Sequence, residues 1–174
     1  MNGFYLAIGK QGSGKTALIT KLCTEQYNKE KRPIFSNYSL FKLPYKKIDL
    51  DTLLDMLDQD PNSLNDSIIL LDEIHIYLDS LDFMRKNNRR LQIFFSQLRK
   101  RNILLYATTQ YLMNVDIRIR RQCMNVFEMQ NIYKDVFEVT THEIDGYFSE
   151  PISTYKLNLS NYYDSYDTNE VIMS

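Results

Sequence analysis

The chain contains few of the residue types that characterise fibrous, disordered or disulfide-stabilised proteins. Its 174 residues include no Trp, two Cys, four Pro and five Gly, while 44% are hydrophobic. This composition excludes a collagen-like fibre, a disulfide scaffold and disorder throughout the chain. Cys23 and Cys123 form neither a C-x-x-C motif nor a metal-binding spacing, so we predict two buried, reduced thiols.

Long apolar runs are also lacking. Runs such as Ile68–Leu71 and Ile103–Ala107 are far shorter than the roughly 18–20 residues of a membrane-spanning helix. No basic segment precedes an apolar stretch near the N-terminus, so we expect neither a signal peptide nor a membrane span and predict a cytoplasmic protein. Length and apolar content suit one domain, for which we take residues 1–160, followed by an acidic, Tyr-rich tail at 161–174.

The formal net charge of −1 argues against a nucleic-acid partner, but it averages over four unmixed blocks. Residues 1–48 carry nine Lys/Arg and two Asp/Glu (+7), and residues 49–82 carry ten acids and no Lys/Arg (−10). Residues 83–121 carry ten bases and one acid (+9), and residues 122–174 carry two bases and nine acids (−7). Such blocks indicate faces with different partners, so the net charge does not decide whether nucleic acid binds.

Strand-like and helix-like patterns alternate along the chain. Short apolar runs typical of buried strands occur at residues 4–8, 33–36, 67–71 and 103–109. Apolar residues recur at helical spacing in residues 16–27, 50–57 and 84–100. Alternating apolar and polar residues, typical of later strands or a hairpin, occupy 126–132, 136–141 and 152–159. Together these patterns predict an α/β fold of three αβα layers, with a mostly parallel central sheet and C-terminal antiparallel strands.

A glycine-rich loop follows the first predicted strand and opens the first predicted helix. Residues Gly9–Thr16 match G-x-x-x-x-G-K-[ST] in full, the P-loop motif in the context that it requires. Its glycines let backbone N–H groups approach phosphate oxygens, and the helix N-terminus adds the positive end of its dipole. We expect Lys15 to bridge the β- and γ-phosphates of ATP and the Thr16 hydroxyl to bind Mg²⁺. The residues expected around the nucleotide are Gly9, Gln11, Gly12, Ser13, Gly14, Lys15, Thr16 and Ala17.

Two later strands are predicted to end in catalytic side chains. Residues 68–71 lead into Asp72 and Glu73, the Walker B pattern. We expect Asp72 to hold Mg²⁺ through water and Glu73 to orient and polarise the attacking water, although Glu73 could instead cap the next helix. A nucleotide kinase needs no such carboxylate, so the pair favours hydrolysis. Gln110 ends the strand at 103–109 and is the candidate sensor of the γ-phosphate, with a plain surface residue as the alternative.

These pieces together resemble the FtsK–HerA superfamily of P-loop ATPases, and within it the zonular occludens toxin (Zot)-type and viral genome-packaging ATPases. Besides the loop, the resemblance rests on Ser36–Tyr38, Leu71–His75 and Gln97–Asn102. In that family a helix ending in a basic turn leads into a strand that closes on T-Q, here Thr109 and Gln110. The resemblance covers roughly residues 3–131 and implies the three-layer P-loop NTPase fold.

The resemblance also implies a homo-oligomeric ring, pentameric or hexameric, that hydrolyses ATP at subunit interfaces. An arginine finger from the neighbouring subunit would stabilise the transition state. The position of the basic turn makes Arg99 and Arg101 the first candidates, with a solvated basic face as the alternative. The second candidates are Arg118, Arg120 and Arg121.

We therefore predict a ring ATPase that translocates DNA, with viral genome packaging as the first interpretation. DNA would bind through basic residues 85–101, in sequence-independent and salt-sensitive phosphate contacts that stimulate ATP hydrolysis. Capsid or virion proteins are candidate partners, and the place of action would be the host cytoplasm or the virion. Three alternatives stay open: a Zot-type virion-assembly or secretion ATPase that acts on protein, a small-molecule P-loop kinase, and a nucleotide-regulated interaction module.

His75 and the C-terminal tail each allow two interpretations. His75 could contact the nucleotide or a neighbouring subunit, or could simply start the next helix. The tail around Tyr162–Thr168 could dock on a subunit or capsid, or could be a disordered end.

Overall fold

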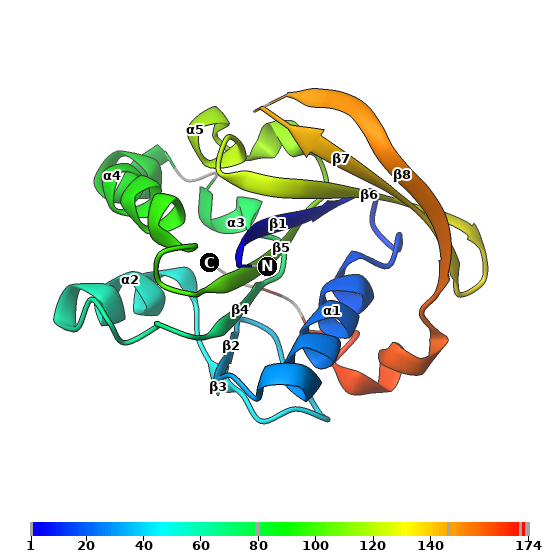
Figure 1. Ribbon diagram of the computed structural model, residues 1–174, viewed down its shortest axis with the longest axis horizontal. Coiled ribbons are helices and arrows are strands. Elements are labelled where there is room, and N and C mark those ends of the chain that lie inside the picture. Colours follow the sequence, from blue (N-terminus) through cyan, green and yellow to red (C-terminus); the bar gives the residue numbers. More distant parts are fainter. Residues whose placement is uncertain (1, 79–80, 146, 171, 173–174) are drawn as a thin grey trace.

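An eight-stranded mixed sheet with helices on both faces forms the body of the chain (Figure 1). The computed structural model describes residues 2–78, 81–145, 147–170 and 172, without the side chains of residues 78, 81–88, 148 and 149. The strands are β1 (Gly3–Ile8), β2 (Ile34–Ser36), β3 (Lys46–Lys47), β4 (Ile68–Leu71), β5 (Leu104–Thr109), β6 (Cys123–Tyr133), β7 (Val136–Ile144) and β8 (Phe148–Asn158). The helices are α1 (Lys15–Glu30), α2 (Leu50–Gln59), α3 (His75–Leu78), α4 (Leu81–Gln97) and α5 (Ile117–Arg120), with 3-10 turns η1 (Leu112–Asn114) and η2 (Ser160–Ser165).

The strand order is β3-β2-β4-β5-β1-β6-β7-β8. Every pair from β3 through β6 is parallel, whereas β6–β7 and β7–β8 are antiparallel. This arrangement confirms the predicted α/β fold with a mostly parallel sheet and antiparallel C-terminal strands. Because β1, β4 and β5 run in the same direction, their carboxyl ends meet at one edge of the sheet, which is where ligands bind in open α/β sheets.

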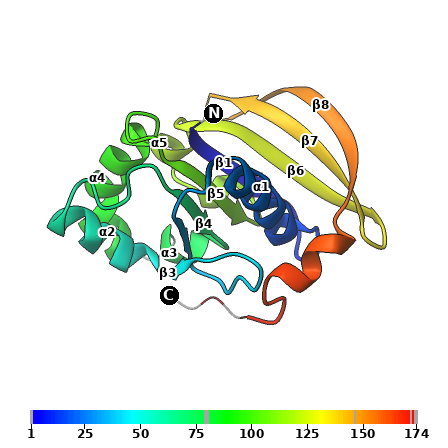
Figure 2. The same cartoon turned by 60° about the horizontal axis from the view of Figure 1, so that its bottom comes forward.

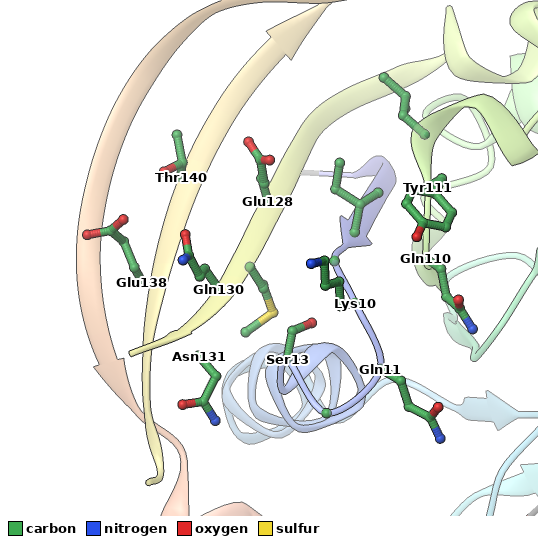
Figure 3. A pocket seen from close by; sticks show the side chains of 15 residues that line it. Lys10, Gln11, Ser13, Gln110, Tyr111, Glu128, Gln130, Asn131, Glu138 and Thr140 are labelled. Carbon is green, nitrogen blue, oxygen red and sulfur yellow. The ribbon is translucent and has the colours of Figure 1, made fainter. Parts of the chain in front are cut away.

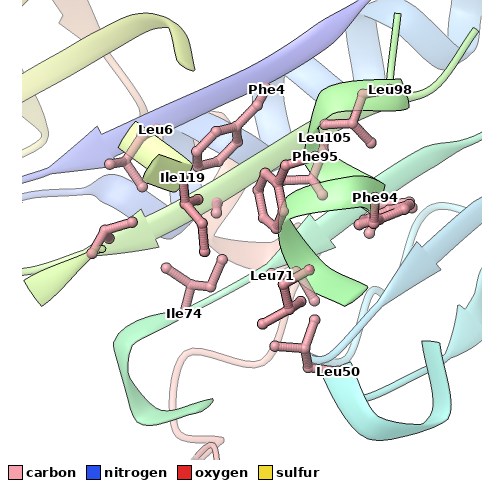
Figure 4. Close-up of a cluster of buried hydrophobic side chains, with 14 of the residues drawn as sticks. Phe4, Leu6, Leu50, Leu71, Ile74, Phe94, Phe95, Leu98, Leu105 and Ile119 are labelled. Atoms are coloured by element: carbon pink, nitrogen blue, oxygen red, sulfur yellow. The ribbon is translucent and has the colours of Figure 1, made fainter. Parts of the chain in front are cut away.

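The parallel strands are buried on both faces, which explains their continuous apolar sequences. On one face, α2, α4 and α5 cover a core that includes Phe4, Leu71 and Leu105 (Figure 4). The rings of Phe4 and Phe95 meet edge to face there, with centroids 4.9 Å apart. On the other face α1 packs over alternate residues of the same strands, so the layers are helix, sheet and helix (Figure 2).

Helix α4 ends three residues earlier than the sequence predicts. The predicted helix reaches Lys100, but α4 stops at Gln97. The chain then closes in a turn in which the Arg101 N–H donates to the Gln97 carbonyl (3.0 Å) and the Ile103 N–H donates to the Leu98 carbonyl (2.8 Å). Asn102 takes a left-handed backbone conformation (φ 57°), which is typical of a residue that ends a helix. The basic turn is therefore a loop that leads straight into β5.

The described part of the tail lies against the body rather than apart from it. After η2, Tyr166 is buried and its ring meets that of Tyr38 edge to face at 6.0 Å. The Phe41 N–H donates to the Ser165 carbonyl at 2.9 Å, and the Ser39 N–H donates to the Glu170 carboxylate at 2.5 Å. The segment after β8 thus crosses the face that carries α1, as its red ribbon shows in Figure 2.

Both cysteines are buried and unpaired with each other, as predicted. No helix in the described part of the chain combines the length and apolar character that crossing a membrane requires.

Candidate active site

The glycine-rich loop joins the carboxyl end of β1 to the start of α1. A Cβ on Gly9 would lie 2.5 Å from the Met129 carbonyl oxygen, and one on Gly14 would lie 3.0 Å from the Phe137 ring. Gly14 also has a left-handed backbone (φ 83°) where α1 begins, so neither position tolerates a side chain. The loop is therefore held against β6 and β7 on one side.

The residues expected around a nucleotide form this one continuous turn. Ser13, Lys15 and Ala17 are buried, whereas Gln11 and Gly12 are exposed. The Lys15 ammonium donates to the carbonyls of Gly9 (3.0 Å) and Lys10 (3.2 Å). These carbonyl contacts place the ammonium inside the curve of the loop, where phosphate oxygens would bind.

Thr16 and Asp72 converge from two elements far apart in sequence. The Thr16 hydroxyl lies 3.0 and 3.1 Å from the two oxygens of the Asp72 carboxylate. Burial is the main influence on the Asp72 carboxyl and raises its pKa, while hydrogen bonds from Thr108 and Thr16 and the Lys15 charge oppose that rise. A half-buried carboxylate beside a hydroxyl is a suitable oxygen pair for Mg²⁺.

The side chains of the site can bind both ligands that the motif implies, Mg²⁺ and the phosphates of a nucleotide. No group of three or more His, Cys, Asp or Glu side chains among the described residues could hold a metal. Mg²⁺ bound with phosphates needs only one or two protein ligands, which Thr16 and Asp72 can provide. The Ser13 hydroxyl is buried in the loop and makes no hydrogen bond within the described part of the chain. The donor set therefore fits a Mg²⁺-bound polyphosphate.

Glu73 lies at the mouth of the loop in a strained backbone conformation (φ 48°). One oxygen of its carboxylate lies 3.8 Å from the Lys15 ammonium and the other lies 3.2 Å from His75 Nδ1. Burial raises the pKa of the Glu73 carboxyl, although the Lys15 charge opposes that rise. His75 does begin α3, and it also contacts Glu73 directly, so both interpretations of this histidine apply.

Two residues that the sequence did not single out for catalysis hold the acidic pair in place. The Asn37 amide donates to the Asp72 carbonyl (2.9 Å) and accepts from the Asp72 N–H (2.7 Å). The Thr108 hydroxyl donates to the Asp72 carboxylate (2.6 Å) and accepts from the Glu73 N–H (2.8 Å). Asn37 lies in a segment that carried the resemblance, but the function of either side chain appears only when β2, β4 and β5 lie side by side.

Gln110 lies beside the loop at the end of β5. Its carbonyl accepts a hydrogen bond from the Gly9 N–H at 3.3 Å. Its side chain lines a cavity of about 760 Å³ whose walls come from the loop, the chain after β5, and the β6–β7 hairpin. Figure 3 shows Gln110 and Tyr111 on one side of Lys10 and the hairpin residues on the other.

The first arginine candidates, Arg99 and Arg101, are not brought to this site within one chain. Arg99 and Arg101 precede β5, whose first residue pairs with Gly3 at the start of β1. The loop follows the other end of β1, which is roughly 16–20 Å away for a strand of that length. Arg101 donates to the Gln97 side chain, while Arg99 is exposed.

The second set of arginines lies on or directly after α5. Arg118 forms a two-point ion pair with Asp116, at 2.9 and 2.8 Å. Arg120 is buried, with its guanidinium 5.5 Å from the centre of the Tyr147 ring. Arg121 is exposed.

The basic segment 85–101 is only partly described. The side chains of Arg85 and Lys86 lie outside the described residues. Arg89, Arg99 and Lys100 are exposed. Arg90, in contrast, contacts Asp58 and the Leu54 carbonyl of α2, so part of the acidic block neutralises part of the basic block within the same chain.

Comparison with known proteins agrees with this geometry. The family described as "ATPase family associated with various cellular activities (AAA)" matches residues 5–131. No curated protein sequence matches the chain.

Several solved structures share the fold. The N-terminal domain of zonular occludens toxin from Neisseria meningitidis is similar with a TM-score of 0.70 and 19% identity, over 96% of this chain and 100% of that one. B204, the DNA-packaging ATPase from Sulfolobus turreted icosahedral virus, is similar with a TM-score of 0.60 and 13% identity, over 90% and 98%. The genome packaging NTPase B204 from Sulfolobus turreted icosahedral virus 2, in complex with AMPPCP, is similar with a TM-score of 0.61 and 10% identity, over 89% and 96%.

Proposed function

The chain belongs to the ATPase family associated with various cellular activities (AAA), and from that premise we propose that it hydrolyses ATP as one subunit of a ring that translocates DNA. Packaging of a viral genome is the task that we assign to this ring. The observation that carries the proposal is the convergence of Lys15, Thr16, Asp72 and Glu73 at one edge of the sheet. Hydrolysis of a phosphoanhydride needs a phosphate cradle, a metal-binding pair and a carboxylate for water, and these four side chains supply them.

Each residue has a distinct part in the proposed reaction. Backbone N–H groups of the loop after Gly9 and the Lys15 ammonium bind the β- and γ-phosphates. Thr16 and Asp72 hold Mg²⁺, which neutralises charge on those phosphates when it is bound. Glu73 orients the attacking water, and Gln110 contacts the γ-phosphate.

The contacts that Lys15 makes without nucleotide suggest how nucleotide binding would make the Glu73 carboxylate available to water. Lys15 donates to the Gly9 and Lys10 carbonyls and lies 3.8 Å from Glu73. Phosphate oxygens would replace these acceptors, so the Glu73 carboxylate would keep His75 as its neighbour and become available to water. This sequence of contacts favours hydrolysis over the kinase alternative, in which the phosphoryl group passes to a bound acceptor.

A ring explains why the arginine candidates lie away from the loop. Arg99 and Arg101 are too far to reach phosphate in their own chain, so a finger at this position would act on the nucleotide of a neighbouring subunit. The exposed Arg99 fits that role better than Arg101, whose guanidinium is bonded to Gln97. Ring size, pentamer or hexamer, and association with capsid or virion proteins in the host cytoplasm belong to the same proposal.

DNA binding is assigned to the exposed bases around α4 and its following turn, Arg89, Arg99 and Lys100. The test is the rate of phosphate release from Mg²⁺-ATP with and without duplex DNA, alongside native mass. We expect stimulation by DNA at about 50 mM salt that declines towards about 200 mM salt, because phosphate contacts release counterions. We also expect a mass of five or six chains. A rate that ignores DNA at both salt concentrations would contradict the translocation proposal.

Charge-removal variants make this test specific. Arg89→Ala/Lys100→Ala removes two exposed bases from the proposed DNA surface and should reduce stimulation while leaving the DNA-free rate unchanged. Lys29→Ala/Lys46→Ala removes the same charge from exposed positions on α1 and β3 and should keep the stimulation. Equal effects of the two variants would indicate a general charge effect rather than a defined DNA surface.

The likeness to a zonular occludens toxin domain supports a second candidate, an assembly or secretion ATPase that acts on protein. Its catalytic residues would be the same. The DNA test separates the two, because a protein-directed ATPase has no reason to be stimulated by duplex DNA.

A further inference from the structure

The β6–β7 hairpin extends past the end of β1 and presents a patch of four polar side chains on one face. Ile8, the last residue of β1, pairs with Glu128, and β6 continues to Tyr133. The four side chains form two directly opposed cross-strand pairs, Glu128 with Thr140 and Gln130 with Glu138. The residues between them point to the opposite face, since side chains alternate along a strand, and Met129 and Val139 are buried there in the core around α1.

All four side chains line the cavity beside the loop, as Figure 3 shows. The volume of about 760 Å³ falls within the range of roughly 300–1,000 Å³ that is common for small-molecule sites. The loop residues Gly9–Ser13 form another wall, but neither Asp72 nor Glu73 lines the cavity. The cavity therefore extends from the phosphate loop towards the hairpin and away from the acids of the hydrolytic site.

The chemistry of the hairpin patch excludes phosphate as its ligand. Glu128 and Glu138 are acceptors only when ionised, and their charge repels a polyphosphate. They would accept hydrogen bonds from hydroxyl or amino groups, while Gln130 and Thr140 can both donate and accept. Glu128 is also held in place by His142, whose Nε2 lies 3.0 Å from its carboxylate. The hairpin patch is therefore a surface rich in hydrogen-bond acceptors beside a loop that is suited to anions.

The distance between the hairpin patch and the loop is fixed by direct packing. The Phe137 ring of β7 lies 3.0 Å from the point where a Cβ of Gly14 would be. A Cβ of Gly9 would lie 2.5 Å from the Met129 carbonyl oxygen of β6. A ligand that spans loop and patch would therefore meet a preformed site, which lowers the cost of binding.

We propose that Glu128, Gln130, Glu138 and Thr140 bind the ribose and base of the nucleoside triphosphate whose phosphates bind the loop. The two halves of such a ligand match the two walls of the cavity. The anionic half faces the glycine-rich loop, and the uncharged half, with its hydroxyl and ring donors, faces carboxylates and an amide. This inference rests on the proposed function only in so far as the loop binds a nucleotide.

The test compares Mg²⁺-ATP with inorganic tripolyphosphate, which has the phosphates but no nucleoside. Affinities are measured by calorimetry on the intact chain and on the variant Gln130→Ala/Glu138→Ala. We expect the variant to bind ATP about tenfold to a hundredfold more weakly, as expected for two lost hydrogen bonds of which one involves a charged acceptor. Its affinity for tripolyphosphate should stay the same or rise, because the variant removes a negative charge from the cavity.

A matched control uses the same strand. Glu143→Ala removes an exposed carboxylate from β7 outside the cavity and should leave both affinities unchanged. Because Gln130 is exposed and Glu138 is half-buried at the surface of the hairpin, the double variant is expected to unfold at the same temperature as the intact chain.

Two kinds of result would overturn the inference, and they differ in what they say of the proposed function. If the variant loses equal affinity for ATP and tripolyphosphate, or loses neither, the hairpin patch does not bind the nucleoside. The proposal that the chain is an ATPase would be unaffected. Failure of the intact chain to bind either ligand would overturn the inference together with the proposed function.

Discussion

The Thr108 hydroxyl on β5 donates a 2.6 Å hydrogen bond to the carboxylate of Asp72, the residue that follows β4. The same hydroxyl accepts the Glu73 N–H at 2.8 Å, and the Thr108 carbonyl accepts the Ile74 N–H at 2.9 Å. Glu73 has a left-handed backbone (φ 48°), which is unfavourable for a residue with a side chain. Thr108 thus joins the end of β5 to the end of β4 and holds the strained turn that carries the Glu73 carboxylate.

Thr108→Val should lower ATP turnover while ATP binding stays within a few-fold of the original. Valine keeps the shape but removes the hydroxyl, so the Glu73 N–H loses its acceptor and the half-buried Asp72 carboxylate loses a donor. The free energy of unfolding should fall by about 1–3 kcal/mol, the cost of such buried groups. Thr108→Ser keeps the hydroxyl and should restore turnover. Normal turnover in the valine variant would show that this contact does not position Glu73.

Lys15→Ala should weaken ATP binding by about a hundredfold or more, because charged contacts to the β- and γ-phosphates are lost. Equilibrium binding of a fluorescent ATP analogue measures the change. Lys29→Ala, an exposed lysine near the other end of α1, is the matched control and should bind normally. Unchanged ATP affinity in Lys15→Ala would overturn the assignment of the loop.

Mixing two inactive variants tests the arginine finger. Arg99→Ala/Arg101→Ala subunits should lose activity by about a thousandfold, and Glu73→Gln subunits should be inactive for a different reason. In a mixed ring, some interfaces combine an intact Glu73 with an intact arginine turn, so phosphate release should recover. No recovery would count against this turn as the finger, and Arg121→Ala in the same mixture would then test the second set of arginines.

Both thiols should be unreactive in the native chain. Burial raises the pKa of the Cys23 thiol to about 12 and also raises the pKa of the Cys123 thiol. The thiolate is the nucleophile, and only about one part in ten thousand of Cys23 would be thiolate at pH 8, so the reaction should be slow. Labelling with an aromatic disulfide reagent should therefore be slow in buffer and complete in denaturant. Rapid labelling of the native chain would contradict the buried placement.

Motif residues were the part of the site that the sequence could predict. The loop and the acidic pair each follow a short apolar strand, so their positions at one edge of a parallel sheet follow from local sequence alone. Asn37 and Thr108 have no such local signal for their role. They reach Asp72 because the strand order places β2 and β5 on either side of β4, and strand order is a property of the whole fold.

The acidic and basic blocks of the sequence predicted charged faces, but not which residues these faces contact. Blocks of one charge indicated faces with different partners, yet Asp58 of α2 pairs with Arg90 of α4 in the same chain. The two helices are far apart in sequence and become neighbours only when both cover the same face of the sheet. The tail gave no sequence pattern that separates a packed from a disordered end, and its contacts with Tyr38 and Ser39 depend on the tertiary structure.

The central claim is that this site hydrolyses ATP with Glu73 acting on the attacking water. The measurement that tests it most directly is steady-state phosphate release from Mg²⁺-ATP by the intact chain and by Glu73→Gln, with ATP affinity determined in parallel. We expect measurable release by the intact chain and a fall of at least about a hundredfold in the variant, with ATP affinity within a few-fold of the original. Release at the original rate by Glu73→Gln, or ATP binding without any release by the intact chain, would contradict it.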